Sequence, residues 1–153
     1  MPNLFPTNYQ NKTITSDIVD AADTQIGYKP SIHYDINKGE VVRDGTNKVM
    51  TATGIEAWQQ WCYNCLNTVR GSCAAVPYVF GIDREAVFKA ESKEEAETIL
   101  TVQITDALMA DPYKRTKYVS SIDFNWLTPD SVELTVLVQG IDDAEIDIIT
   151  TLR

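Results

Sequence analysis

The last third of the chain alternates apolar and polar residues, and this period of two constrains the fold more than any other feature. Ile122, Phe124 and Trp126 are separated by single polar residues, and two more alternating runs follow turn signals, at 132–139 and 144–150. Successive side chains of a strand point to opposite faces, so each run has an apolar and a polar face. The pattern predicts three strands of an antiparallel sheet with one covered face.

Two amphipathic helices are the natural cover for that face. The first follows a capping box, in which the Thr53 hydroxyl and the Glu56 carboxylate can bind free N–H groups, and it runs to Arg70-Gly71. The second follows a capping box at 92–95 and stops at Asp111-Pro112, because the residue before a proline disfavours the α region. The apolar face of the first helix consists of Ile55, Trp58, Trp61, Cys62, Cys65, Leu66 and Val69.

A β-hairpin precedes the helices. Ile32, Tyr34 and Ile36 alternate with polar residues within 31–45, and Asn37-Lys38-Gly39 turns the chain. The whole pattern predicts an α+β two-layer sandwich. In it, a mainly antiparallel sheet, made of the N-terminal hairpin plus three C-terminal strands, is covered by two helices. A short helical turn capped by Asp83 is expected between them.

The chain is expected to divide into an extended N-terminal arm, 1–30, and a domain, 31–153. The arm contains three prolines and shows no sustained period of 2 or 3.6. One interpretation is a frayed terminus. The other is a segment that orders against a neighbouring subunit, because Leu4, Phe5 and Tyr9 are costly to leave in water.

The charge of the chain limits its partners. Thirteen Lys and Arg oppose 22 Asp and Glu, a net charge of −9, which disfavours nucleic acids and anionic membranes. No apolar run approaches the length of a membrane span, and residues 1–10 do not read as a secretory signal. Residues 120–153 hold seven acids against Arg153 alone. We therefore expect a basic partner surface and salt-sensitive assembly.

No constellation of residues predicts catalysis, a cofactor or a metal site. Cys62 and Cys65 lie three apart in mid-helix, so we interpret them as core thiols rather than as a redox or zinc pair. His33 has no catalytic motif beside it and is interpreted as a structural hairpin residue. Acids are plentiful, but no pair is singled out as the two carboxylates of a glycosidase. The basic cluster 114–117 is typical of a solvated loop.

With these elements placed, the chain resembles XkdS-like phage baseplate proteins. The resemblance is carried by the order and spacing of five segments and covers about residues 31–153. They are the hairpin His33-Tyr-Asp-Ile-Asn-Lys-Gly-Glu-Val, the helix end Asn67-Thr-Val-Arg-Gly71, the loop Pro77-Tyr-Val-Phe-Gly-Ile-Asp83, the helix end Ala107-Leu-Met-Ala-Asp-Pro112, and the terminal three-strand block. This group is similar to the wider sheath-initiator family of contractile tails, which includes baseplate wedge proteins.

The resemblance implies a structural protein, not an enzyme, without cofactors. It would lie in the baseplate of a phage or a phage-tail-like particle that is assembled in the bacterial host cytoplasm. Family members ring the end of the tail tube, join hub or wedge proteins to it, and template the first sheath ring. The expected partners are sheath protein, wedge and hub proteins, and the tube or its initiator, with six copies in a ring. One alternative is a small peptidoglycan-cleaving enzyme, because family members carry a "lysozyme-like" label; another is a generic acidic adaptor domain.

Candidate partner-binding residues also follow from the resemblance. The wider family contacts wedge proteins through a Glu-Pro-Arg loop, but this chain has Gly71-Ser-Cys-Ala-Ala-Val-Pro77 there. Around that loop, the residues that keep the XkdS-like pattern are Thr68, Arg70, Tyr78 and Gly81.

The last strand is the other candidate contact. Ala144, Ile146 and Ile148 are its candidate docking residues, and we expect the strand to accept an added strand from a partner. The alternative is an ordinary edge strand protected by Glu145 and Asp147. Leu4 and Phe5 are the candidate contacts of the arm.

Overall fold

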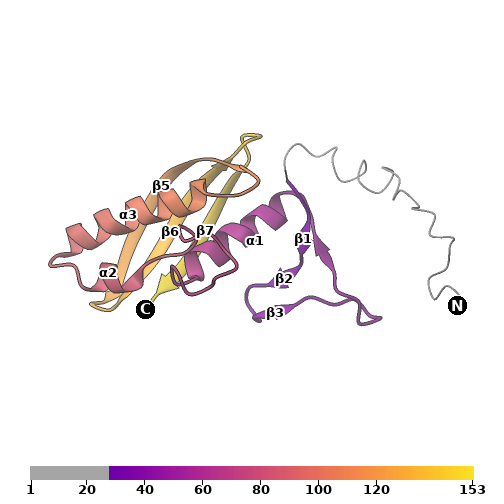
Figure 1. Ribbon diagram of the computed structural model, residues 1–153, viewed down its shortest axis with the longest axis horizontal. Coiled ribbons are helices and arrows are strands. Elements are labelled where there is room, and N and C mark those ends of the chain that lie inside the picture. Colours follow the sequence, from indigo (N-terminus) through magenta and orange to yellow (C-terminus); the bar gives the residue numbers. More distant parts are fainter. Residues whose placement is uncertain (1–27) are drawn as a thin grey trace, which may run out of the picture.

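The computed structural model describes residues 28–153, and Figure 1 shows the arrangement of their elements. The predicted arm contacts Leu4 and Phe5 lie outside the described residues. The predicted α+β class is confirmed: three helices accompany antiparallel strands.

The three C-terminal strands form one antiparallel sheet in the order β5-β6-β7. They are β5 (Thr116–Thr128), β6 (Ser131–Gly140) and β7 (Glu145–Leu152). The alternation predicted here is confirmed, since Val132, Leu134, Val136 and Val138 of β6 are fully buried. Strand β5 begins six residues before Ile122 and contains register shifts between Thr116 and Tyr118 and between Val119 and Ser121.

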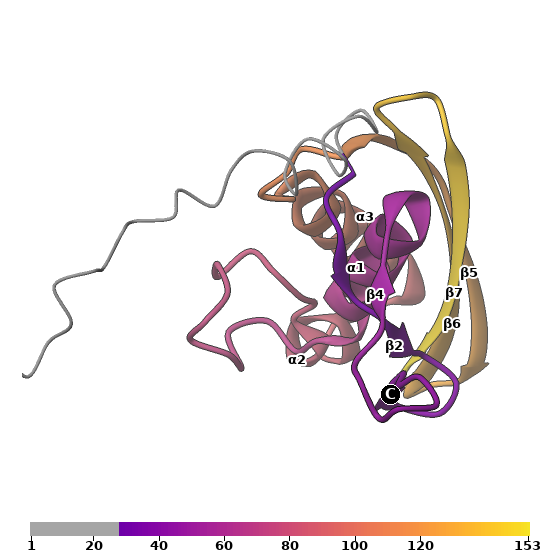
Figure 2. The same ribbon diagram turned by 90° about the vertical axis from the view of Figure 1, so that its right-hand side faces the viewer.

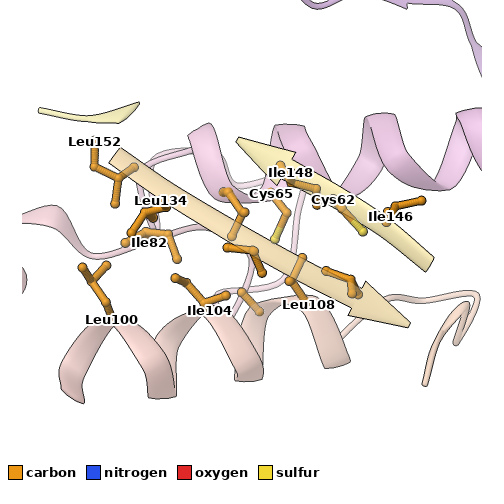
Figure 3. Packing of buried hydrophobic residues seen from close by; sticks show 14 of the residues in the cluster. Cys62, Cys65, Ile82, Leu100, Ile104, Leu108, Leu134, Ile146, Ile148 and Leu152 are labelled. Atoms are coloured by element: carbon orange, nitrogen blue, oxygen red, sulfur yellow. The ribbon is translucent and has the colours of Figure 1, made fainter. Parts of the chain in front are cut away.

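Helices α1 (Gly54–Asn67) and α3 (Lys93–Met109) cover one face of this sheet, as predicted, and Figure 2 shows the two layers edge-on. Short helix α2 (Arg84–Phe88) lies beside α3. Figure 3 shows the core between the layers. Its buried members include Cys62, Cys65, Ile82, Leu100, Ile104, Leu108, Leu134, Ile146, Ile148 and Leu152. Ile55 and Val69, expected on the buried stripe of the first helix, are instead 42% and 45% exposed.

The caps of the helices are partly as predicted. The Asp83 and Ser92 side chains accept N–H groups of Ala86 and Glu95, so both caps are confirmed. The predicted Thr53 cap is wrong. The Thr53 side chain makes no cap hydrogen bond, because Gly54 enters the helix at φ +60°. The first helix also ends at Asn67, before Arg70-Gly71.

The N-terminal hairpin is not part of the main sheet, which corrects the predicted architecture. It is a branched ribbon, residues 31–52, made of two separate two-stranded sheets. Strand β1 (Ser31–Ile32) pairs with β4 (Thr51–Ala52), and β2 (Tyr34–Asp35) pairs with β3 (Glu40–Val41). Strands of two residues offer little apolar surface, and of the paired residues in this ribbon only Ala52 is buried, so the ribbon remains outside the sandwich.

Three backbone hydrogen bonds hold the branch point of the ribbon. His33 N–H donates to Met50 O, Met50 N–H donates to Val42 O, and Val42 N–H donates to His33 O, at 2.9–3.0 Å. From this closed triangle the chain runs into the stem toward α1, the turn 35–40, and a second turn, 43–49. Figure 1 shows the ribbon beside α1 and outside the sandwich of helices and sheet.

One glutamine fastens the ribbon to α1. The Gln60 amide accepts Tyr34 N–H at 2.9 Å and donates to Ile32 O at 2.6 Å, as a neighbouring strand would. His33 Nε2 lies 3.2 Å from Glu56 Oε1, so the histidine has the structural role expected for it, and the Glu56 carboxylate serves the ribbon rather than a capping box.

The last residues of the predicted arm also contribute to the domain. Tyr28 is 4% exposed, its ring lies 5.5 Å from that of Trp58, and its hydroxyl donates to Asp142 Oδ1 at 2.5 Å. A Cβ on Gly140 would lie 2.1 Å from that hydroxyl, so the close approach requires glycine. Tyr28 thus fixes the start of the described chain at the tip of the β6–β7 hairpin.

The basic cluster 114–117 is not simply a solvated loop. Arg115 is 2% exposed and forms a bidentate ion pair with Asp111, at 2.7 and 3.0 Å. The Asp111 carboxylate also accepts the backbone N–H groups of Tyr113 and Arg115. The pair therefore fixes the turn from α3 into β5.

Candidate assembly surface

The two cysteines spaced like a redox or zinc pair, Cys62 and Cys65, are core residues, as predicted. Cys62 and Cys65 are fully buried. Burial raises the pKa of the Cys65 thiol to about 11 and raises the pKa of Cys62 as well, so both thiols are protonated at neutral pH. Within residues 28–153 no cluster of three or more His, Cys, Asp or Glu side chains could hold a metal ion, and none of the described helices could cross a membrane.

The free edge of β7 is the first surface that can bind another chain. Strand β7 pairs with β6 on one side and with no strand of the described chain on the other. Gly140 N–H donates to Ala144 O at 2.7 Å across the three-residue turn, so this is a hydrogen-bonded pair. Such pairs alternate along an antiparallel ladder, so the register directs the backbone groups of Ile146, Ile148, Thr150 and Leu152 toward β6.

The N–H and C=O groups of the intervening residues therefore face the open edge. These residues are Glu145, Asp147, Ile149 and Thr151. Ile149 is 58% exposed, whereas the side chains of Ile146 and Ile148 point into the core. An unpaired row of this kind is a template for an added strand.

A groove runs beside this edge. Two adjoining hollows share Tyr63 of α1 and Ile149 of β7. The first is bounded by Ile36 and Asn37 at the turn of the ribbon; the second ends at Arg84. Arg84 donates to the backbone oxygens of Asn67 and Arg153, at 2.9 and 3.3 Å, and so closes that end of the groove.

The outer face of the sheet is acidic. In the register, Asp123 lies opposite Thr135, Glu133 opposite Asn125, and Asp147 opposite Leu137, on the face away from the helices. Lys117, near one end of the face, pairs with Asp143 at 2.7 Å. The negative charge that the sequence concentrates in 120–153 therefore lies partly on this open face.

The loop between α1 and α2 is the second surface. It contains no charged residue from Gly71 to Ile82. Its base is clamped: Arg70 and Ile82 N–H groups donate to Ile82 O and Thr68 O, at 3.0 and 2.9 Å, and Arg70 Nε donates to Gly81 O at 3.1 Å. Gly81 has φ +97°, and a Cβ there would lie 2.6 Å from Thr68 O. The base is therefore rigid, and the tip projects from it.

The candidate residues of this loop have two different positions. Tyr78 is 74% exposed beside the exposed Val79, and its ring lies next to Gly71 at the start of the loop. Thr68, Arg70 and Gly81 are at the base of the loop and hold it in place. Thr68 Oγ1 donates to Asn64 O, and Arg70 also reaches Gln103 O.

The candidate residues of the last strand are placed differently from expectation. Ala144 is half-buried where β7 begins, while Ile146 and Ile148 are 6% and 3% exposed. The groups available at the edge belong instead to Asp147, Ile149 and their alternate neighbours. The alternation of apolar residues did not indicate which backbone N–H and C=O groups of β7 face outward, and it did not point to Tyr63. The length of the turn after Gly140 was the available signal for the direction of these backbone groups.

Comparison with protein families gives one match. The family described as the contractile injection system sheath initiator matches residues 31–143, from the first strand of the ribbon to the β6–β7 turn. Curated protein sequences gave no significant match.

Proposed function

This chain belongs to the contractile injection system sheath initiators, a family of structural baseplate proteins, and we propose that it joins the baseplate to the tube end and templates the first sheath ring. Hub and wedge proteins bind it on the baseplate side. Sheath subunits bind on the other side, by adding a strand to β7. Six copies ring the end of the tail tube or its initiator.

The free edge of β7 is the observation that carries the proposal. Four residues there leave both backbone polar groups unpaired, and an exposed isoleucine lies among them. A partner strand gains main-chain hydrogen bonds there, and side-chain contacts supply specificity. Glu145 and Asp147 discourage pairing with strands of the wrong charge.

The projecting loop is the proposed wedge contact. The uncharged loop presents Tyr78, an aromatic residue of the kind enriched at protein interfaces, on a base held by Thr68, Arg70 and Gly81. The arm residues Leu4 and Phe5 are proposed to contact a hub or tube protein or an adjacent copy. The particle, a phage or a phage-tail-like assembly, would form in the bacterial host cytoplasm.

A proline at the open edge tests strand addition. Asp147→Pro removes an N–H that faces outward, so it should block sheath formation and leave the domain folded, because proline is tolerated at strand edges. Asp147→Ala, which keeps the N–H, is the matched control and should still start sheaths. Ile146→Pro is unsuitable, since it removes a bond to β6.

Electron microscopy of assembled particles is the measurement. The wild-type protein and the alanine control should appear as a six-fold ring at one end of each sheath. Normal sheaths on Asp147→Pro would refute strand addition at β7. Cleavage of purified peptidoglycan, abolished by replacement of one carboxylate, would instead establish the enzymatic alternative.

A further inference from the structure

The turn of the branched ribbon lies against the groove beside β7. In the turn between β2 and β3, Ile36 and Asn37 line the same hollow as Asp147, Ile148 and Ile149. Gln59 and Tyr63 of α1 complete this hollow. Figure 2 shows β2 beside the same end of the sheet. The open edge is therefore one wall of a slot, not an isolated border of the sheet.

We propose that this slot encloses an amphipathic strand of the sheath protein, held between the β7 edge and the ribbon turn. The inference rests on the proposed strand addition at β7 and names the chemistry of the strand. Neighbouring strands lie about 4.8 Å apart, so an added strand takes the position immediately beyond β7. Its alternate side chains then face either the helix layer or the outer face of the sheet.

The two faces of the slot require different side chains. Toward the helix layer, an added strand meets Tyr63 and Ile36, so apolar residues are favoured there. Toward the outer face, it lies beside Glu145 and Asp147 and, farther along the strand, beside the exposed Ile149; neither carboxylate is in an ion pair with a described Lys or Arg. Lysine or arginine is favoured on that side. The bound strand thus alternates apolar and cationic residues.

The ribbon is suited to act as the second wall. Gln60 attaches its stem to α1 through two hydrogen bonds, which fixes the ribbon at its base. Its turn is held locally, since Asp35 Oδ1 accepts the N–H groups of Asn37 and Lys38, at 3.0 and 3.1 Å. Few contacts join the turn to the rest of the domain, so it can close on a strand at little cost.

Photo-crosslinking with the sheath protein of the same particle tests the slot. The photoreactive amino acid p-benzoylphenylalanine is placed in full-length protein at Asn37 or at Ile149, one on each wall. Tyr118, which is exposed on the opposite edge strand, is the control position. Mass spectrometry of the product should identify one sheath segment, with alternating apolar and cationic residues, trapped from both walls and not from the control.

The other outcomes separate this inference from the proposed function. Trapping of a sheath segment from Ile149 alone would overturn the slot and leave strand addition at β7 standing. No sheath crosslink from either wall, with sheaths still starting normally, would overturn both. Crosslinks to a second copy of this chain, or to its own residues 1–27, would overturn the choice of occupant.

Charge reversal tests the cationic face of the strand. Glu145→Lys with Asp147→Lys should lower the yield of the Ile149 crosslink at least about tenfold at low salt. The control pair Asp123→Lys with Glu133→Lys makes the same change in net charge on the same face, away from the β7 edge, and should leave the yield within about twofold. Equal losses in the two pairs would show a general charge effect and overturn the cationic assignment.

Discussion

Replacing Asp111 by alanine should cost more stability than replacing Arg115 by methionine, although the two residues form one ion pair. Arg115 has no hydrogen-bond partner for its guanidinium other than Asp111 among the described residues. Asp111 in contrast accepts two backbone N–H groups as well. Removal of the carboxylate thus leaves a buried cation and two orphaned donors, whereas removal of the guanidinium leaves an anion that is still solvated by the backbone.

The magnitudes follow from burial. Breaking a buried pair by removing one partner costs about 3–5 kcal/mol, and each lost backbone hydrogen bond costs about 1 kcal/mol. Asp111→Ala should therefore lower the free energy of unfolding by about 5 kcal/mol or more. For Arg115→Met the two remaining N–H groups offset part of the cost, and the methionine retains packing against Trp61 and Tyr113. We expect a loss of about 2–3 kcal/mol.

Urea unfolding, followed by circular dichroism and by tryptophan fluorescence, measures both values, and coincidence of the two probes establishes two-state behaviour. At about 2–4 °C per kcal/mol, Asp111→Ala should also lower Tm by roughly 10–20 °C. If the alanine variant does not fold, Asp111→Asn, which keeps one acceptor oxygen, gives the comparison. A loss for Arg115→Met that equals or exceeds the loss for Asp111→Ala, or losses below 1 kcal/mol for both, would refute the assigned roles.

Three other outcomes are expected. Gly81→Ala should destabilise the domain by about 1–3 kcal/mol in urea unfolding, because the residue has φ +97° and a Cβ would clash with Thr68 O. Tyr78→Ala, at an exposed residue of the same loop, should change stability by less than about 0.5 kcal/mol, and equal effects would contradict the clamped base. N-ethylmaleimide should modify only Cys73 in the native protein, because Cys62 and Cys65 are buried and burial raises the pKa of both thiols. Mass spectrometry measures the labelling, and rapid labelling of all three cysteines would show an open core. The hydrogen bond from Tyr28 lowers the pKa of Asp142. Its contribution to stability is therefore present above the usual carboxyl pKa and is lost as pH falls through the lowered value. Tyr28→Phe should flatten that part of the curve of stability against pH, and an unchanged curve would contradict the coupling.

The sheet was predictable from sequence, whereas the ribbon was not. Alternation in β6 is interrupted only by Leu137 on the outer face, and the side chains of Val132, Leu134, Val136 and Val138 are buried on the covered face of the central strand, so periodicity and burial agree. In the ribbon, Ile32 and Val41 alternate with polar residues but remain 58% and 37% exposed. Periodicity alone could not distinguish a strand of the sheet from a two-residue strand held by a glutamine side chain.

At the open edge of β7, the sequence also predicted one property and not another. The alternation correctly put the β7 side chains of Ile146 and Ile148 on the covered face, and this apolar prominence made them the candidate docking residues. The direction of the backbone N–H and C=O groups follows a different rule, because it depends on the turn that joins β6 to β7. The αL residue Asp143 and the Gly140–Ala144 hydrogen bond set that turn, and they give the outward groups to Asp147 and Ile149.

Arg115 illustrates a third limit. Its neighbours Lys114 and Lys117 are exposed, so the composition of the cluster resembled a solvated loop. The partner lies four residues earlier, at the end of α3, and a proline between them turns the chain so that the guanidinium folds back on the carboxylate. Asp111, an acid four residues before Arg115, was the sequence signal available for this ion pair.

Under the proposed strand addition, the four outward-facing residues of β7 also limit how tightly one copy can hold a sheath strand. They offer at most eight backbone groups, which at about 0.5–1.5 kcal/mol each supply about 4–12 kcal/mol. Loss of translational and rotational freedom costs about 4–15 kcal/mol, so a lone edge binds reversibly. The proposed ring of copies would change this balance, because each sheath subunit that docked would raise the effective concentration of the next strand. Initiation would then depend on avidity: a misplaced subunit would dissociate, and a complete ring would persist.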